Sequence, residues 1–236
     1  ADIGTKVSLT PGAAPTPAAG SITMNADGTI TVAAGTTAGT YAYPYTICEV
    51  LNATNCDTAT ATVVVSAAPI VANNDSYTGV NGATGNPNVG NAYTDAGTGQ
   101  DTLNGVVVDP SDIVGTVTTP ATSINGGPVP SLDPATGVVS VPAGTPAGNY
   151  TIEYRICEVL NATNCDTASI TITVDAAPID AVNDTMTPIN GASGATTASV
   201  IVANGGAADS LNSTPLTMAD IGTKVSLTPG AAPTPA

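Results

Sequence analysis

Two pairs of cysteines are the residues best suited to do chemistry in this sequence. Cys48 and Cys56 enclose seven residues, and Cys157 and Cys165 enclose seven more within the same run of letters, ICEVLNATNCDT. Such a pair can form a disulfide, bind a metal or act as a redox couple. No histidine or further cysteine is present to complete a zinc site, and an acidic sequence does not offer the low-pKa environment of reactive thiols. The pairs therefore predict two structural disulfides in an oxidising, extracellular setting.

Catalytic side chains are scarce in the rest of the chain. The sequence has no histidine, tryptophan or phenylalanine, and Arg155 is its single arginine. Acid–base or nucleophilic catalysis needs a positioned base or a tuned carboxylate pair, and we expect the eighteen acidic residues at turns and strand exteriors instead. A net charge of −15 repels phosphate backbones. The composition therefore argues against an enzyme and against a nucleic-acid-binding protein.

Calcium is the one cofactor for which the sequence offers candidates, and they are weak. Asn74, Asp75, Asn183 and Asp184 supply oxygen atoms next to two Ala-Ala-Pro motifs, where such ligands can bridge neighbouring units. The alternating Asp spacing of a calcium loop is absent, and Asn and Asp near a strand start are more often turn formers. No metal site is therefore assigned, and no cofactor is expected.

Removal of calcium provides the first test. We expect a chelator to leave the melting temperature of the chain unchanged, because the four candidate residues are read as turn formers. Calorimetry with and without chelator measures this. A drop of several degrees would show that calcium stabilises the fold.

The sequence repeats itself with a period of 109 residues. Ile47–Thr58 recurs at Ile156–Thr167, and residues 1–18 recur without change at 219–236, which is two periods away. Self-similarity at a fixed spacing indicates an array of modules, and this sequence reads as a window on such an array.

Module boundaries are expected at the Ala-Ala-Pro joints. Proline fixes its own backbone angle, and a short apolar linker there separates two strand patterns. This division predicts the C-terminal part of one repeat over residues 1–68, a complete repeat over 69–177 and the N-terminal part of the next over 178–236.

Alternating apolar residues indicate β-strands within each repeat. Tyr150, Ile152, Tyr154 and Ile156 share one strand face, and the residues between them, with Cys157, share the other. The following strand alternates in the same way, with Ala168, Ile170, Ile172 and Val174 inward. Further strands are expected at Thr29–Val32, Ile113–Thr118, Val138–Val141 and Ala198–Val202.

About seven short strands in 109 residues, divided by Gly, Pro, Asn and Asp turns, predict an all-β fold. We expect tandem immunoglobulin-like antiparallel β-sandwiches arranged head to tail. Tyr41 and Tyr150 follow a glycine at the start of a late strand, where each would form either a tyrosine corner or an ordinary core contact. No apolar run is long enough for a membrane-spanning helix.

The two cysteine hairpins also carry a family resemblance. The segments TYAYPYTICEVLNATNCDTATATVVV and NYTIEYRICEVLNATNCDTASITITV, each followed by AAPI, resemble repeats of giant surface adhesins of Bacteroidetes, of the SprB-type gliding-motility family. The joints are also similar to those of cadherin-like bacterial repeats. This resemblance implies type IX secretion, display on the outer cell surface and movement by the gliding machinery. It further implies O-glycosylation at Asp-Ser/Thr-apolar triplets, which here present Thr58, Thr102, Thr167, Thr185 and Ser210.

Two functions follow as hypotheses of different classes. The first is structural: a stretch of a long extracellular filament that projects an adhesive tip from the bacterial surface, with neighbouring repeats as its immediate partners. The second is a module that itself binds polysaccharide or a solid surface, in which exposed Tyr43, Tyr45 and Tyr154 would stack on sugars. Their alternation with Ile47 and Ile156 favours burial in the core instead. A glycan array separates the hypotheses, because a stalk should show no ligand.

Overall fold

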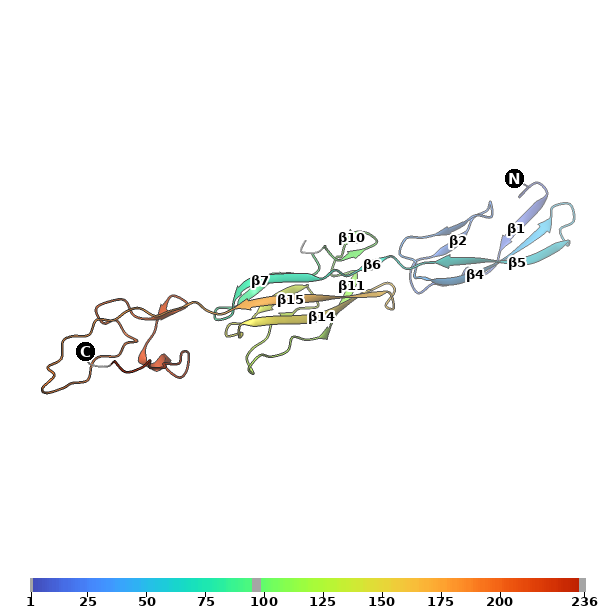
Figure 1. Ribbon diagram of the computed structural model, residues 1–236. Helices are drawn as coiled ribbons and strands as arrows, with labels where there is room; N and C mark the ends of the chain where they lie inside the picture. The colour runs from blue at the N-terminus through green and yellow to red at the C-terminus, as the bar shows by residue number, and fades with distance from the viewer. Residues whose placement is uncertain (1, 95–98, 234–236) are drawn as a thin grey trace.

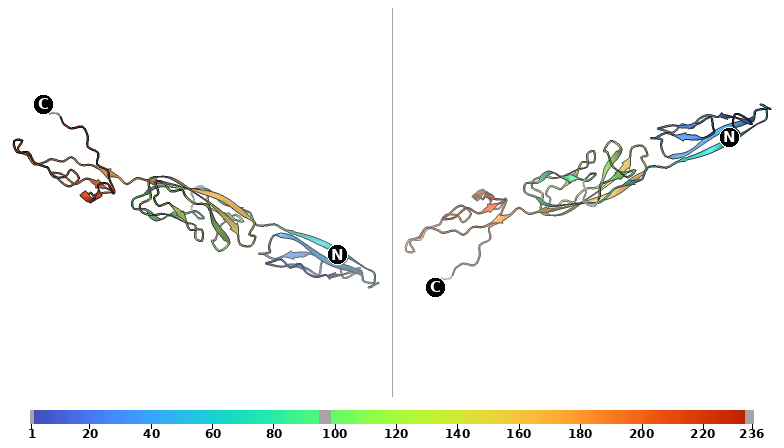
Figure 2. Two further views of the ribbon diagram at one scale, coloured as in Figure 1. Left: turned by 90° about the horizontal axis from the view of Figure 1, so that it is seen from below. Right: turned by 90° about the horizontal axis from the view of Figure 1, so that it is seen from above.

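The computed structural model describes residues 2–94 and 99–233. Its strands form three groups in chain order. For description we keep the predicted boundaries and call these stretches the N-terminal segment (residues 1–68), the central unit (69–177) and the C-terminal segment (178–236). Figure 1 shows these groups lying one after another along an extended molecule, and the two views of Figure 2 show the same extended shape.

The N-terminal segment holds two small sheets. One sheet has the order β1-β4-β5 and the other pairs β2 with β3, all antiparallel. The strands are β1 (Val7–Pro11), β2 (Ile22–Met24), β3 (Ile30–Val32), β4 (Gly39–Glu49) and β5 (Cys56–Val65).

The central unit is a β-sandwich with a small additional sheet. A four-stranded sheet, β11-β14-β15-β7, faces a three-stranded sheet, β12-β13-β8, and a third sheet, β10-β9-β6, lies at the entry to the unit. The strands are β6 (Ile70–Val71), β7 (Asp75–Asn81), β8 (Asn86–Asn91), β9 (Thr102–Leu103), β10 (Val106–Val107), β11 (Ile113–Thr119), β12 (Ser131–Leu132), β13 (Val138–Val141), β14 (Gly148–Glu158) and β15 (Cys165–Asp175).

The core of the central unit follows the predicted alternation. Every second residue of β14 is buried, from Tyr150 to Ile156, and so is every second residue of β15, from Ala168 to Val174. These side chains pack against Leu132, Val139 and Val141 of the opposite sheet. The two main sheets contain seven strands, so the all-β sandwich class is confirmed.

One pairing departs from the antiparallel prediction. The strand β7 pairs with β15 in parallel, with Ile170 opposite Asp75 and Asp175 opposite Asn81. The first long strand and the last strand of the unit therefore run in the same direction. As a result the chain enters the central unit at one end and leaves it at the other (Figure 1).

Both tyrosine corner candidates bond back to the chain just upstream. The Tyr150 hydroxyl donates to the Pro146 carbonyl at 2.7 Å, and the Tyr41 hydroxyl donates to the Thr37 carbonyl at 2.8 Å. A hydroxyl that reaches backbone a few residues upstream is the arrangement of a tyrosine corner. The tyrosine therefore fixes the turn that leads into the long strand of each hairpin.

The C-terminal segment has less regular structure. Its sheet β16-β17-β18 consists of β16 (Ile179–Asp180), β17 (Ser210–Leu211) and β18 (Thr214–Pro215), and it is followed by a short 3-10 helix, η1 (Met218–Asp220). The strand expected at Ala198–Val202 is absent, so that prediction was wrong. Its counterpart in the central unit pairs with β13, and residues 178–236 include no counterpart of β13. A strand without a partner leaves its backbone groups unpaired and does not form.

The duplicated eighteen residues adopt different structures in their two positions. Residues 7–11 form β1 and pair with β4, whereas the identical residues 225–229 form no strand. Leu9 is half-buried, but its duplicate Leu227 is exposed. The same sequence therefore becomes a strand only where a neighbouring strand is available, which shows that pairing decides the local structure here.

Candidate functional site

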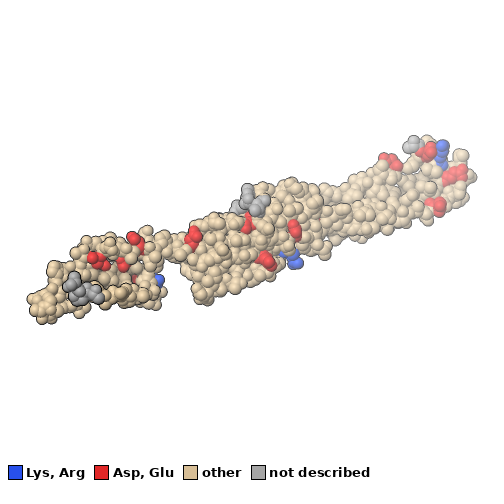
Figure 3. Space-filling view, viewed as in Figure 1, with Lys and Arg blue, Asp and Glu red and all other residues tan. Residues whose placement is uncertain are grey.

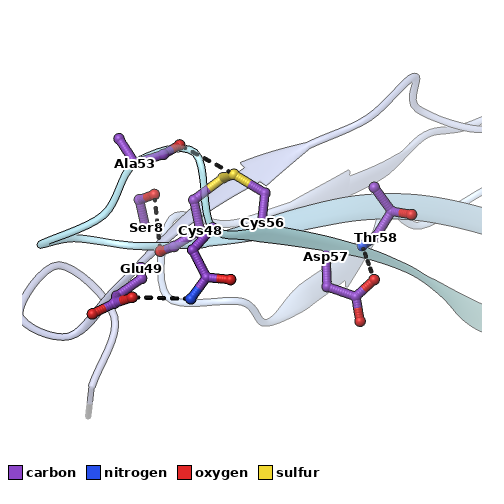
Figure 4. The surroundings of a disulfide bond; sticks show 8 residues. Ser8, Cys48, Glu49, Ala53, Cys56, Asp57 and Thr58 are labelled. Atoms are coloured by element: carbon purple, nitrogen blue, oxygen red, sulfur yellow. Dashed lines mark hydrogen bonds between the residues drawn. A yellow bond between two sulfur atoms is a disulfide. The ribbon is translucent and has the colours of Figure 1, made fainter.

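The two cysteine hairpins form the tips of the long strand pairs. Disulfides join Cys48 to Cys56 and Cys157 to Cys165, with Sγ–Sγ distances of 2.02 and 2.04 Å. Each bonded pair stands at opposite positions of an antiparallel ladder, the arrangement that the alternation indicated. Each bridge therefore ties two neighbouring strands at the end of their hairpin. Figure 4 shows the bridge between Cys48 and Cys56.

Polar side chains organise the loop beyond each bridge. In the first hairpin Asn55 Nδ2 donates to Glu49 Oε2 at 2.9 Å, and in the second Asn164 Nδ2 donates to Glu158 Oε2 at 2.8 Å. The amides of Asn55 and Asn52 hold the pKa of the Glu49 carboxyl below its ordinary value. Cys56 Sγ lies 3.2 Å from the Ala53 carbonyl oxygen, which is a contact, because a disulfide sulfur carries no proton to donate.

The second hairpin also holds the joint between the N-terminal segment and the central unit. The Ala38 amide donates to Asn161 Oδ1 at 2.7 Å, and Asn164 Nδ2 donates to the Ala68 carbonyl at 2.7 Å. On the other side of the linker, the Ala72 amide donates to Asp166 Oδ2 at 2.9 Å. Three side chains of one hairpin therefore bind both the preceding segment and the linker.

Comparison of the two hairpin tips shows what the joint covers. Leu51 at the first tip is 88% exposed, while its counterpart Leu160 is half-buried. Cys157 is buried although its strand phase indicated an outward position, so that part of the prediction was wrong. The alternation along β14 indicates only which of its side chains face the opposite sheet. It does not take account of the preceding segment and the linker, which lie against the end of the second hairpin.

A buried carboxylate lies just inside the same joint. Asp101 is fully buried, and its Oδ1 accepts a hydrogen bond from the Asn73 amide at 2.7 Å. Its Oδ2 lies 2.9 Å from the hydroxyl of Tyr154, which is also 3.1 Å from the Asn73 carbonyl. Burial raises the pKa of Asp101 to about 6 and, with the nearby charge of Asp101, raises that of Tyr154 well above its ordinary value.

The expectation that all carboxylates lie at turns and strand exteriors was therefore wrong. Asp75, Asp101, Glu158 and Asp220 are buried. For Asp101 the available signal was its repetition, because Asp-Thr-Leu-Asn at 101–104 answers Asp-Ser-Leu-Asn at 209–212. A carboxylate that recurs with its turn next to a joint is a candidate for a structural role.

The calcium candidates occupy different environments. Asn74 Oδ1 accepts hydrogen bonds from the Ser169 amide at 2.8 Å and its hydroxyl at 3.0 Å, so this side chain ties β7 to β15. Asp75 is buried, Asp184 is half-buried and Asn183 is exposed. Across residues 2–94 and 99–233, no three His, Cys, Asp or Glu side chains gather closely enough to hold a metal ion.

The hydroxyls expected to carry glycans are accessible to different degrees. Thr58, Thr167 and Thr185 are exposed, and Thr102 and Ser210 are half-buried in the two-residue strands β9 and β17. Asp57 and Asp166 each accept a hydrogen bond from the amide of the following threonine. Modification at these five positions stays a prediction.

Removal of the Asn161 side chain tests the joint directly. Asn161→Ala deletes the acceptor of the Ala38 amide. One such hydrogen bond contributes about 1 kcal/mol, which corresponds to about a fivefold change in the ratio of molecules with the joint in contact to molecules with the joint apart. We expect small-angle scattering to show a wider range of bending between the N-terminal segment and the central unit. Asn52→Ala alters the same position of the exposed first hairpin and should leave the scattering unchanged. Equal effects of both substitutions would contradict a role of Asn161 at the joint.

Within the part of the chain that the structure describes, no helix is long and apolar enough to cross a membrane.

Comparisons with known proteins find similarity of structure at low identity. No family model and no curated protein matches the sequence. The human desmocollin-1 ectodomain aligns with 62% of this chain at 11% identity and a TM-score of 0.34, and the chain covers 27% of that structure. The first two repeats of human mucin-like protocadherin align with 73% of this chain at 13% identity and a TM-score of 0.34, and the chain covers 85% of that structure.

A bacterial structure is also similar at this level. A SusE-like, surface-located polysaccharide-binding protein from the heparin utilisation locus of Bacteroides thetaiotaomicron aligns with 77% of this chain at 13% identity and a TM-score of 0.29. The chain covers 31% of that protein. At these TM-scores the similarities carry no argument about this chain, whose fold class rests on its own strands and core.

Proposed function

We propose that this chain is a stretch of a long extracellular filament built from head-to-tail β-sandwiches. The observation that carries the proposal is the parallel pairing of β7 with β15. Because the first long strand and the last strand run the same way, each module passes the chain from one end to the other. A series of such modules extends in one direction and does not fold back on itself.

The dimensions of one module suit a spacer. The strands β14 and β15 contain eleven residues each, which corresponds to about 36 Å at about 3.3 Å per residue. The joint adds rigidity, because the Asn161 and Asp166 side chains bind backbone on both sides of the linker. Repetition of this one unit would place an adhesive tip far from the cell without requiring a long non-repetitive sequence.

The surface fits a filament that remains separate from its neighbours. The net charge is −15 with only three basic residues, and the face in Figure 3 shows acidic residues scattered singly along the molecule. Like-charged surfaces repel one another, which keeps extended chains soluble.

The polysaccharide-binding alternative gains no support from the tyrosines. Tyr43 and Tyr154 are buried, and Tyr45 is half-buried, so two of the three rings are not available to stack on a sugar. We therefore propose a stalk in preference to a binding module, and we expect no ligand on a glycan array.

The finer assignment rests on the resemblance of the hairpin segments to SprB-type adhesins. It places the chain on the outer surface of a bacterium, exported by type IX secretion and moved by the gliding machinery. It also assigns O-linked glycans to the hydroxyls of Thr58, Thr102, Thr167, Thr185 and Ser210. Intact mass of the native protein with peptide mapping tests the glycans, and an unmodified mass would remove them from the proposal.

Electron microscopy of the intact parent protein tests the filament itself. We expect threads whose length grows in proportion to the number of 109-residue repeats. Compact globules would overturn the proposal, because they would require the modules to pack side by side.

A further inference from the structure

The second hairpin carries its disulfide and its joint contacts on the same short loop. The bridge between Cys157 and Cys165 closes the loop of residues 158–164. The three side chains that bind the preceding segment or the linker lie in this loop or directly after the bridge, namely Asn161, Asn164 and Asp166. A covalent bridge at the base of a loop restricts the conformations that the loop can adopt. The disulfide therefore positions the groups that hold the joint.

Polar contacts inside the loop connect the bridge to the linker. Asn164 Nδ2 donates to Glu158 Oε2 at 2.8 Å and also to the Ala68 carbonyl at 2.7 Å. The Glu158 amide donates to the Asn164 carbonyl at 2.9 Å, and the Asn164 amide donates to the Asn161 carbonyl at 2.8 Å. Glu158 directly follows the bridged Cys157, so a change at the bridge reaches the linker through Glu158 and Asn164.

The joint in turn covers the bridge. Cys157 is buried and Cys165 is half-buried, whereas in the first hairpin Cys48 is half-buried and Cys56 is exposed. Both hairpins have the same sequence, ICEVLNATNCDT. The local sequence around the two bridges is therefore identical, and the difference in accessibility comes from what lies against each hairpin.

Access matters because a disulfide is reduced by direct attack on one of its sulfur atoms. A thiolate of a dithiol reductant attacks one cysteine sulfur, displaces the other as a thiolate and forms a mixed disulfide. The second thiol of the reductant then attacks its own sulfur in this mixed disulfide, which closes the reductant into a cyclic disulfide and releases the first cysteine. Two electrons and two protons pass in total from the dithiol to the two cysteines. At the second hairpin the attacking thiolate must reach a sulfur that the joint covers.

We propose that this joint is a redox-sensitive hinge, in which the bridge between Cys157 and Cys165 and the contact across the joint stabilise each other. In the closed joint the bridged loop holds Asn161 and Asn164 against their partners, and the sulfur atoms are covered. When a small dithiol reduces the bridge, the loop loses its constraint and the joint bends more freely. Coupling of this kind is reciprocal, so the factor by which the closed joint favours the bridge is also the factor by which the bridge favours the closed joint.

The rates at which the two bridges are reduced in one chain provide the first test. The full chain is incubated with dithiothreitol well below its melting temperature, and free thiols are trapped by alkylation at successive times. Peptide mapping then gives the reduced fraction of each pair. We expect the pair Cys48 and Cys56 to be reduced faster than the pair Cys157 and Cys165, because Cys56 is exposed. Equal rates would overturn the proposal, because they would show that the joint does not protect its bridge.

Asn161→Ala opens the joint without changing the bridge. If attack requires the open joint, its rate follows the population of open molecules. Loss of the hydrogen bond from the Ala38 amide should therefore raise the reduction rate of the second bridge about fivefold. The rate at the first bridge should not change, and the matched substitution Asn52→Ala should leave the second bridge at its native rate. An unchanged rate at the second bridge of the Asn161→Ala chain would contradict the coupling.

Removal of the bridge measures the coupling in the other direction. In the chain with Cys157→Ala and Cys165→Ala, we expect small-angle scattering to show a wider range of bending, as for Asn161→Ala. The control with Cys48→Ala and Cys56→Ala should bend as the native chain does. The measurement is made well below the melting temperature, so it reports the joint and not the stability of the central unit. An unchanged range of bending without the second bridge would overturn the proposal.

The combined variant distinguishes coupling from two independent effects. If the bridge acts through the joint contacts, adding Asn161→Ala to the chain without the second bridge should widen the bending by less than Asn161→Ala does alone. Fully additive effects would show that the bridge does not act through this contact and would contradict the hinge. Each of these results leaves the filament proposal intact, because microscopy of the parent protein tests that proposal separately.

Discussion

Replacement of Cys157 and Cys165 by alanine is expected to lower the free energy of unfolding of the central unit by about 2.5 kcal/mol. The bridge closes a loop with a sequence separation of 8, and chain entropy assigns that value to so short a loop. For a domain of this size the loss corresponds to a fall in melting temperature of about 10 °C or more. Alanine is chosen because Cys157 is buried and serine would bury a hydroxyl. Calorimetry of the full chain measures the change.

The first hairpin supplies the control. Cys48→Ala with Cys56→Ala removes an equivalent bridge from the N-terminal segment and should leave the melting transition of the central unit in place. If the central unit melts at the same temperature with and without its own bridge, the disulfide contributes nothing to its stability. If both double variants lower that transition equally, the two hairpins are coupled along the chain.

The hairpins were predictable from the sequence because their determinants are local. Alternation in β14 and β15 sets which side chains face the core, and a seven-residue spacing between cysteines suits one antiparallel turn. The burial of Tyr43 and Tyr154 follows from the same phase. These features depend on residues within a few positions of each other.

The remaining features depend on partners far away in the sequence. The parallel addition of β7 to β15 joins residues about ninety-five positions apart, and strand composition does not specify the direction of such a pairing. The presence of a pairing strand also decides two other features. Residues Ala198–Val202 form no strand, and the eighteen duplicated residues adopt different structures in their two positions. The contact of Asn161 with Ala38 belongs to the joint, and the repeat period indicates a joint without indicating its hydrogen bonds.

Stability of the central unit is expected to fall as the pH rises from about 4 to about 7, because of Asp101. Burial raises the folded-state pKa of this carboxyl to about 6, above the 3.8 of an ordinary aspartate. Between these values the folded chain keeps a proton that the unfolded chain has released, so the contribution of Asp101 is fully present below pH 3.8 and is lost as the pH rises through 6. A raised pKa of this size corresponds to about 3 kcal/mol.

The hydrogen bonds around Asp101 accommodate both charge states. When ionised, the carboxylate accepts from the Asn73 amide and the Tyr154 hydroxyl. When protonated, it can donate through Oδ2 to the Tyr154 oxygen, whose own proton then turns to the Asn73 carbonyl at 3.1 Å. The negative charge of the nearby Asp166 adds to the burial in favouring the protonated form.

Asp101→Asn isolates this effect. The asparagine amide can take the place of the protonated carboxyl, with Nδ2 donating to Tyr154 and Oδ1 accepting from Asn73 at any pH. We expect the variant to match the native chain near pH 4 and to exceed its stability by about 1–3 kcal/mol at pH 7. Thermal unfolding across this pH range measures the difference as a flatter curve for the variant.

The comparison needs a variant that loses the same charge elsewhere. Asp109 is exposed, and hydrogen bonds from the Ser111 amide and hydroxyl lower its pKa, so its own contribution is lost only as the pH falls below the ordinary aspartate value. Asp109→Asn should therefore keep the slope of the native chain between pH 4 and pH 7. If it flattens the curve as much as Asp101→Asn does, the slope arises from the net charge of the chain, and the buried carboxyl at the joint is not its source.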